Sequence, residues 1–374
     1  MFLILNQKAH GQGFLFLAVR VPNNCPNGGL LMRYTRHIGM RLAILLLFGG
    51  LCTVAHAKIV FQSMRNGNTD YHIYVMEDNG SNIRRVTSPD FYDEYPRWFP
   101  DGKRILFLRN WGGFGKIDNE FYIIDADGRN EHAFMENHPF DKYPVPSPDG
   151  TQVAFVGERA EDVSVDVYTY HLESKRLEQL TEQRLVYDLD WSPDGRQIAY
   201  DYTNRGDKES DIWTMNADGS RHRRFTPPQK KGLYSHRGIP RWSPSGKYIM
   251  YQEDESKGAG ALVAGNWTQV REGIVVQHVL TGVRTVHKFP LADWVYSGCW
   301  MGDDQTLLLG IAKDWRAPGA ANFEIYRYDL RNRQLTNLTN HPGTDHYPHW
   351  INSAQAVSPA GKLTTLWGKL KQTD

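Results

Sequence analysis

A short motif recurs six times along this chain and constrains its fold more than any other feature. The clearest copy is YPRWFPDGKRILF at residues 95–107, which joins an aromatic residue and Pro to a Trp, a Pro-Asp-Gly turn and an apolar run. Successive Trp positions lie 45 to 58 residues apart, a period that suits one four-stranded propeller blade. Pro146 replaces the Trp of the second copy. The remaining copies include Tyr143, Trp191, Trp242, Trp300 and Trp350.

The second half of each unit predicts two more strands. Segments rich in β-branched and aromatic residues, such as 121–124 and 212–215, run into Asp-Ala-Asp-Gly or Asn-Ala-Asp-Gly turns. Gly in such a turn accepts the positive φ of a tight hairpin. The segment after Lys58 lacks a preceding Trp strand, whereas the copy at 347–350 has no complete unit after it. We therefore predict an all-β, six-bladed propeller with four-stranded blades, closed by a composite blade from both ends of the chain.

The repeats resemble those of the TolB-like six-bladed propellers. Their units read Tyr-Pro-x-Trp-Ser-Pro-Asp-Gly-Lys-x-Ile-Ala-Phe and later Ile-Tyr-x-Met-Asp-x-Asp-Gly, and the resemblance covers residues 58–369. Complete TolB proteins carry a separate α/β domain ahead of the propeller. Residues 1–57 could not encode such a domain, so we expect the propeller alone. The resemblance implies a fold more strongly than a function.

Residues 1–57 form a predicted leader with a signal peptide. Basic residues precede the apolar run 42–51, and a small-x-small site predicts cleavage after Ala57. The apolar run is too short to span a bilayer comfortably. We therefore expect residues 58–374 to be exported to the periplasm or secreted, without a transmembrane segment. Alternative start sites are Met1, Met32 and Met40.

Cysteine usage fits an exported protein that depends on its core. Lipid anchoring at Cys52 is disfavoured, because Leu51 stands where a small residue is usually required. Loss of the leader leaves Cys299 as the one cysteine, so no internal disulfide is expected.

The composition indicates an ordinary globular chain, which we expect to be a monomer. It has 374 residues, of which 40% are hydrophobic and 23% charged. Residues 1–57 hold five of the 43 Lys and Arg and none of the 42 Asp and Glu, which leaves a slightly acidic propeller. That charge gives no support to nucleic-acid binding.

Loop lengths predict which face of the propeller binds a partner. In a four-stranded blade, the first-to-second and third-to-fourth turns share one face, and here these turns are short and repetitive. The second-to-third and blade-to-blade loops share the other face, which we call the long-loop face. Varied loops on a regular scaffold are common binding sites. The long loops are 110–119, 157–165, 203–210, 253–273 and 313–322.

Two sets of residues on the long-loop face are candidate binding residues. The first set begins the innermost strands and is expected to line the mouth of the central channel, where it could hold a peptide terminus or a cation. Its alternative role is repeat packing by the tyrosines and hydration of the channel by the charges. The second set is a Trp in each of three long loops, which either anchors an interface or folds back on its own blade. The first set is Asp93, Glu94, Tyr95, Asp141, Tyr143, Tyr187, Asp188, His236, Arg237, Tyr296, Asp345, His346 and Tyr347; the second is Trp111, Trp267 and Trp315.

Two enzyme classes remain to be weighed. A prolyl-oligopeptidase-like hydrolase needs a catalytic α/β domain and a Gly-x-Ser-x-Gly elbow, and the sequence has neither. A metal-dependent lyase stays open, because oligogalacturonate lyases are similar in their repeats, a resemblance that implies a His-rich metal site in the channel. His236 and His346 would then be ligands. Against this, His138 and His341 occupy equivalent Asn-His-Pro turns, and His349 replaces an Arg of other copies.

The sequence therefore predicts a non-catalytic binding scaffold of the bacterial cell envelope. The expected partner is a protein or peptide, reached through the long-loop face and the channel mouth, with no cofactor, no metal and no catalytic residue. The alternative is a metal-dependent, carbohydrate-active lyase similar to oligogalacturonate lyase.

Overall fold

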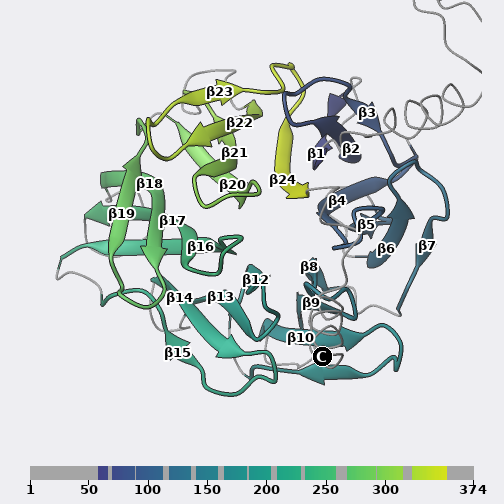
Figure 1. The fold of residues 1–374 in the computed structure, drawn as a ribbon, viewed down its shortest axis with the longest axis horizontal. Helices are drawn as coiled ribbons and strands as arrows, with labels where there is room; N and C mark the ends of the chain where they lie inside the picture. The colour runs from purple at the N-terminus through teal and green to yellow at the C-terminus, as the bar shows by residue number, and fades with distance from the viewer. Residues whose placement is uncertain are drawn as a thin grey trace, which may run out of the picture. The chain divides into compact units, whose positions relative to one another are not determined.

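The strands of the computed structural model form six separate sheets around a common axis (Figure 1). Each sheet holds four antiparallel strands, which confirms the predicted six-bladed propeller. All the described residues belong to one unit of the chain, Ala55–Asp374. The predicted leader and cleavage site lie outside them. The structure describes residues 58–65, 70–88, 90–112, 118–135, 140–158, 164–182, 185–203, 209–228, 232–257, 268–291, 293–314 and 322–351.

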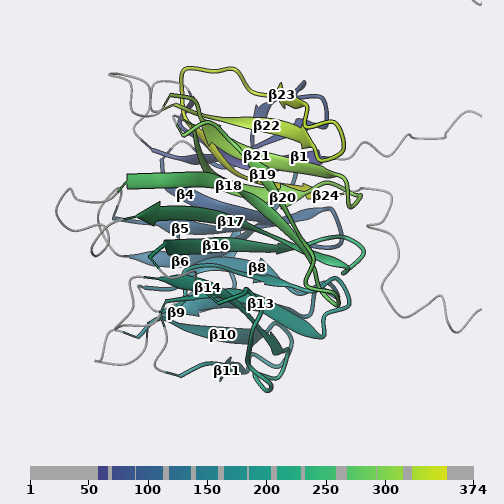
Figure 2. The same cartoon turned by 90° about the vertical axis from the view of Figure 1, so that its left-hand side faces the viewer.

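Five blades are continuous in sequence, with strands that follow one another outward from the axis (Figure 1). Seen from the side, the blades lie one beside the next, and most of their antiparallel strands run across the view (Figure 2). No helix within the described ranges is long and apolar enough to cross a membrane. The strands are β4 (Tyr92–Trp98), β5 (Arg104–Asn110), β6 (Asn119–Asp125) and β7 (His132–Ala133); β8 (Lys142–Pro146), β9 (Gln152–Gly157), β10 (Asp166–His171) and β11 (Leu177–Gln179); β12 (Leu189–Trp191), β13 (Gln197–Thr203), β14 (Ser210–Asn216) and β15 (Arg223–Arg224); β16 (Tyr234–Trp242), β17 (Tyr248–Lys257), β18 (Thr268–His278) and β19 (Arg284–Lys288); and β20 (Trp294–Trp300), β21 (Thr306–Ala312), β22 (Phe323–Asp329) and β23 (Leu335–Asn337).

The sixth blade joins the two ends of the propeller. Its order is β24-β1-β2-β3, so the last strand of the chain is innermost and the first strand is its neighbour. Lys58 pairs with Ile351, and Ser63 with Asp345. This register confirms the predicted composite blade and removes two open sheet edges. The bounds are β1 (Lys58–Ser63), β2 (His72–Glu77), β3 (Arg84–Arg85) and β24 (Asp345–Ile351).

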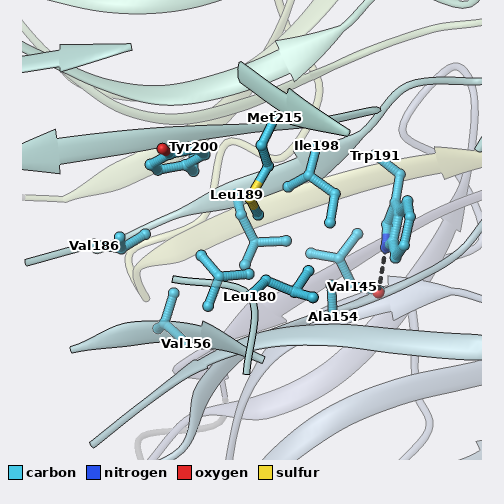
Figure 3. Close-up of a cluster of buried hydrophobic side chains, with 11 residues drawn as sticks. Val145, Ala154, Val156, Leu180, Val186, Leu189, Trp191, Ile198, Tyr200 and Met215 are labelled. Atoms are coloured by element: carbon cyan, nitrogen blue, oxygen red, sulfur yellow. Dashed lines mark hydrogen bonds between the residues drawn. The ribbon is translucent and has the colours of Figure 1, made fainter. Parts of the chain in front are cut away.

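The hydrophobic core lies between neighbouring blades. One cluster packs Val145, Ala154 and Leu180 of the β8–β11 blade against Leu189 and Trp191 of the next blade (Figure 3). The Trp191 indole Nε1 also donates to the backbone O of Val145, at 3.2 Å. Trp191 therefore both fills the interface and satisfies its own polar atom by contact with the preceding blade. Trp300 does the same with the backbone O of Arg241, at 3.0 Å, whereas the indole Nε1 atoms of Trp98 and Trp242 have no hydrogen-bond partner among the described residues.

The turn glycines between third and fourth strands have a second role that the sequence did not show. Gly80 has a φ of 82°, as its turn requires, and a Cβ placed on it would lie 2.3 Å from the backbone O of Leu338 in the preceding blade. Gly128 and Gly219 make similar approaches to neighbouring carbonyls. In the same turn of the β16–β19 blade, Gly282 has a φ of 70° and nothing within 4 Å of such a Cβ.

We expect Gly80→Ala to destabilise the protein by about 1–3 kcal/mol more than Gly282→Ala. Both variants place Ala in the left-handed region, which costs about 1–2 kcal/mol, but only the first forces two blades apart. Denaturant unfolding of both variants measures the difference. Equal losses would show that the blade contact adds nothing to the backbone requirement.

Candidate functional site

The predicted channel-mouth charges are largely paired within the protein. Asp93 is fully buried and lies opposite Arg109 on β5, whose Nε donates to its Oδ1 at 2.8 Å. The same guanidinium also bonds Glu131, at 3.1 Å from Nη2 to Oε2. Asp345, also fully buried, accepts from Arg65 Nη2 at 2.7 Å. These carboxylates hold the starts of β4 and β24 in place.

The β16 blade carries the same ion pair with reversed charges. Arg237 lies opposite Glu253 on β17, and its Nε donates to Glu253 Oε1 at 2.8 Å. Its Nη1 also donates to Asp211 Oδ1 on β14, at 2.7 Å. Arg237 is 3% exposed. Two further predicted residues, Asp141 and Asp188, are likewise buried. The arrangement indicates a structural role for this part of the predicted set.

Four tyrosines of the predicted set meet at the ring axis. They come from β4, β8, β20 and β24, and we call Tyr95, Tyr143, Tyr296 and Tyr347 the tyrosine cluster. The Tyr95 ring centroid lies 4.4 Å from that of Tyr143 and 4.7 Å from that of Tyr347. Tyr296 lies 5.7 Å from Tyr347. All but Tyr347 are partly exposed, so part of the cluster's surface is open near the starts of the innermost strands.

Bulges in the innermost strands aim these tyrosines. Tyr95, Tyr143 and Tyr347 have φ between 49° and 53°, and each lies at a register shift. A bulge re-aims a side chain and frees a backbone N–H. The freed Tyr95 N–H donates to Gln62 Oε1 of the preceding blade, at 2.8 Å. Ile239 of β16 has the same conformation, so the bulge belongs to the repeat and the aromatic side chain is the local addition.

The remaining channel-mouth residues differ in their surroundings. Glu94 is partly exposed beside the cluster, and burial raises the pKa of its carboxyl to about 7. Tyr92 donates its hydroxyl to Glu94 Oε1 at 3.2 Å. Tyr187 is 49% exposed at the start of the β12 blade. His236 is exposed near the start of β16.

His346 lies in an aromatic enclosure rather than at an open surface. Its ring is 4.2 Å from Phe323 and 5.7 Å from both Tyr71 and Tyr296, measured between centroids. It is 6% exposed, and desolvation lowers its pKa to about 3, so the imidazole is neutral. His236 lies two blades away. In the described part of the chain, no three His, Cys, Asp or Glu side chains gather closely enough to hold a metal ion.

Sequence reasoning missed two members of this enclosure. Tyr71 precedes β2, and Phe323 begins β22, so both lie at the entry to the third strand of a blade. The registers Phe61 with Tyr74 and Leu309 with Tyr326 place them at equivalent repeat positions. Alignment of the third strands, in addition to the Trp strands, is the signal that would have found them.

Of the three predicted Trp anchors, Trp111 is the one that the described residues include. It is 47% exposed. Its Nε1 donates to Glu120 Oε2 at 3.0 Å, and its ring meets Phe91 edge-on at 4.8 Å. Trp111 therefore packs partly on its own blade while half of its surface stays open. Trp267 and Trp315 lie outside the described residues.

Comparisons with known proteins support the fold. No protein-family model matches the sequence, and no curated protein matches it. TolB from Acinetobacter baumannii has a similar structure, with a TM-score of 0.59 and 18% identity over 82% of this chain and 70% of that one. Hydrazine synthase of Kuenenia stuttgartiensis gives 0.60 and 15%, over 79% and 47% of the two chains. Oligogalacturonate lyase in complex with manganese gives 0.53 and 14%, over 76% and 74%. The predicted TolB-like propeller is thus confirmed as a fold.

Proposed function

We propose that this chain, which has a propeller fold like that of TolB, is a non-catalytic binding scaffold of the bacterial cell envelope. Its partner is a protein or peptide that meets the long-loop face. We further propose that residues 1–57 direct export, that the propeller acts as a monomer in the periplasm or outside the cell, and that it needs no cofactor.

The observation that carries this proposal is the aromatic surface at one end of the ring. The tyrosine cluster stands at the axis, and Trp111, Phe140 and Tyr187 are 47%, 38% and 49% exposed around it. All lie where innermost strands begin or second strands end, which is the long-loop face. Tyr and Trp offer large rigid contact areas with polar tips and are enriched at interfaces.

The lyase alternative receives less support from the residues that it requires. Its two imidazoles stand on β16 and β24, with the β20–β23 blade between them. One of them, His346, is enclosed by aromatic rings and is 6% exposed. A metal ligand needs an open lone pair and a path for the ion. A scaffold role makes no such demand on His346.

We expect loss of Trp111 and Tyr187 to weaken partner capture strongly. The full chain, tagged and produced in a bacterium that exports it, is used to capture proteins from an envelope extract. The Trp111→Ala, Tyr187→Ala double variant should reduce capture at least about tenfold, because truncation of an aromatic anchor typically costs 2 kcal/mol or more. Thermal unfolding of each variant checks that the fold survives.

The matched control alters exposed apolar residues at the other end of the blades. Leu280 and Val283 are 91% and 65% exposed in the turn that follows β18. The Leu280→Ala, Val283→Ala variant should capture as well as the unaltered chain. Capture that depends on these two residues and not on the aromatic pair would overturn the assignment of the binding face.

A further inference from the structure

The residue directly before the repeated Trp forms a second ring around the axis. Five of the six blades contribute a polar or ionisable side chain there, and we call these residues the axial ring. They lie on the innermost strands of different blades and are near enough to one another to interact electrostatically. The ring lies two residues further along the innermost strands than Tyr95 and Tyr347, and three further along than Tyr296. The members are Arg97, Asp190, Arg241, Cys299 and His349.

Most members of the axial ring have protein partners. Arg241 donates two hydrogen bonds to the Asp188 carboxylate, from Nη1 at 2.9 Å and from Nη2 at 2.7 Å. Its Nε donates to the backbone O of Gly298 at 3.1 Å. Asp190 Oδ2 accepts from the backbone N of Trp242 at 2.8 Å, and His349 Nδ1 accepts from that of Trp98 at 3.0 Å. Asp190 and His349 are partly exposed, so solvent reaches the ring.

Arg97 is the exception. It is 6% exposed, and no residue in the described ranges gives it a hydrogen bond or an ion pair. Asp188 and then Asp190 attract its charge electrostatically, but neither forms an ion pair with it. Burial and the nearby Arg241 charge lower its pKa to about 10, so the guanidinium stays cationic at neutral pH. A guanidinium that forms no ion pair with the protein, in a ring that solvent reaches, is able to take up a small anion.

We propose that Arg97 binds a small free oxyanion, a carboxylate or a phosphate, at the axis of the propeller. A guanidinium presents a planar fork of N–H donors that matches two oxygens of such an ion. The donors of the neighbouring Arg241 are already used by Asp188 and Gly298, which leaves Arg97 as the guanidinium available to an anion. The tyrosine cluster covers the ring on the long-loop side, which favours a small ion over a chain end. This site is separate from the aromatic surface that carries the proposed function.

Calorimetric titration of the full chain with acetate and with phosphate, at fixed ionic strength, tests the proposal. Arg97→Gln should weaken binding at least about tenfold, because it removes charge-assisted hydrogen bonds. Asp190→Asn should strengthen binding, because it removes a competing negative charge and keeps the acceptor for Trp242. The exposed Arg331, which pairs with Asp329, provides the control: Arg331→Gln should bind unchanged.

Opposite responses of Arg97→Gln and Asp190→Asn are not expected from a merely structural ring. The proposal would be overturned if Arg97→Gln bound the anions as tightly as the unaltered chain, or if neither protein bound them. Asp190 and water would then be enough to balance and solvate the Arg97 charge. If Arg97→Gln fails to fold, Arg97→Lys keeps the charge but loses the fork, and should bind more weakly than the unaltered chain. Trialanine with a free C-terminus should not displace acetate; displacement would assign the site to a peptide carboxyl instead.

Discussion

Arg109→Met is expected to destabilise the protein by about 3–5 kcal/mol. Arg109 is 1% exposed and neutralises the fully buried Asp93. The variant leaves that carboxylate without a counter-charge, and an uncompensated buried charge costs far more than a lost surface pair. The guanidinium also stacks over Phe91, at 4.2 Å from its ring centroid, so some packing is lost as well. Denaturant unfolding, followed by Trp fluorescence, measures the change.

A double variant separates the stability lost through the uncompensated Asp93 charge from the stability lost through missing contacts of Arg109. Arg109→Met with Asp93→Leu replaces the pair by apolar side chains of similar size, and such replacements are often nearly neutral. We expect it to recover most of the stability lost by the single variant. Arg331→Met, at an exposed pair with Asp329, should change stability little. If the double variant were as unstable as the single variant, the uncompensated charge of Asp93 would not explain the loss of stability.

Asp201→Asn is expected to change how stability depends on pH. Asp201 is 5% exposed, and its Oδ1 accepts the backbone N–H groups of Tyr187 and Asp188 at 2.7 and 2.9 Å. Burial, and then the nearby charge of Asp188, raise its pKa to about 7. Between pH 4 and 7 the unfolded chain has lost this proton while the folded chain keeps it. The contribution of Asp201 to the free energy of unfolding therefore falls as pH rises through this window, by up to roughly 1 kcal/mol per pH unit.

The Asn variant has no such proton and should lack this contribution. The free energy of unfolding of the two proteins, measured at several pH values, should diverge from pH 4 to 7 in favour of the variant and stay constant above it. Comparison with the unaltered chain is necessary because His346, whose pKa is lowered to about 3, has the opposite effect on the same window. Parallel curves would show that Asp201 is ionised throughout.

The fold was predictable because its information is local. Each blade repeats a Trp strand, a Pro-Asp-Gly turn and an Asp-Gly hairpin, so the number of copies gives the number of blades. Even the composite blade followed from two incomplete units at the ends. The blade-to-blade role of Gly80 was not predictable, because it depends on the distance to Leu338, which is far away in sequence.

The site was predictable only in part. Tyr95, Tyr143 and Tyr347 share one repeat position, and the structure brings them together. The pairing of the charges was harder to predict, because the sequence does not reveal cross-strand register, and it is the register that places Arg109 opposite Asp93. Arg97 was hidden for a related reason. Its repeat position is typical of a buried strand residue. Whether an Arg at this position has an ion-pair partner depends on which residues the other five blades place near the axis.

The composite blade also sets the order of events during folding. Of the described strands, β1 emerges first from the ribosome, and its inner-strand partner, β24, emerges last. Five blades can stack while the first strand still presents an unpaired edge. Closure is thus a late, long-range step, which slows folding as contacts distant in sequence generally do. During that delay β1 of one molecule can pair with β24 of another, so refolding at high protein concentration should favour strand-exchanged dimers over single rings.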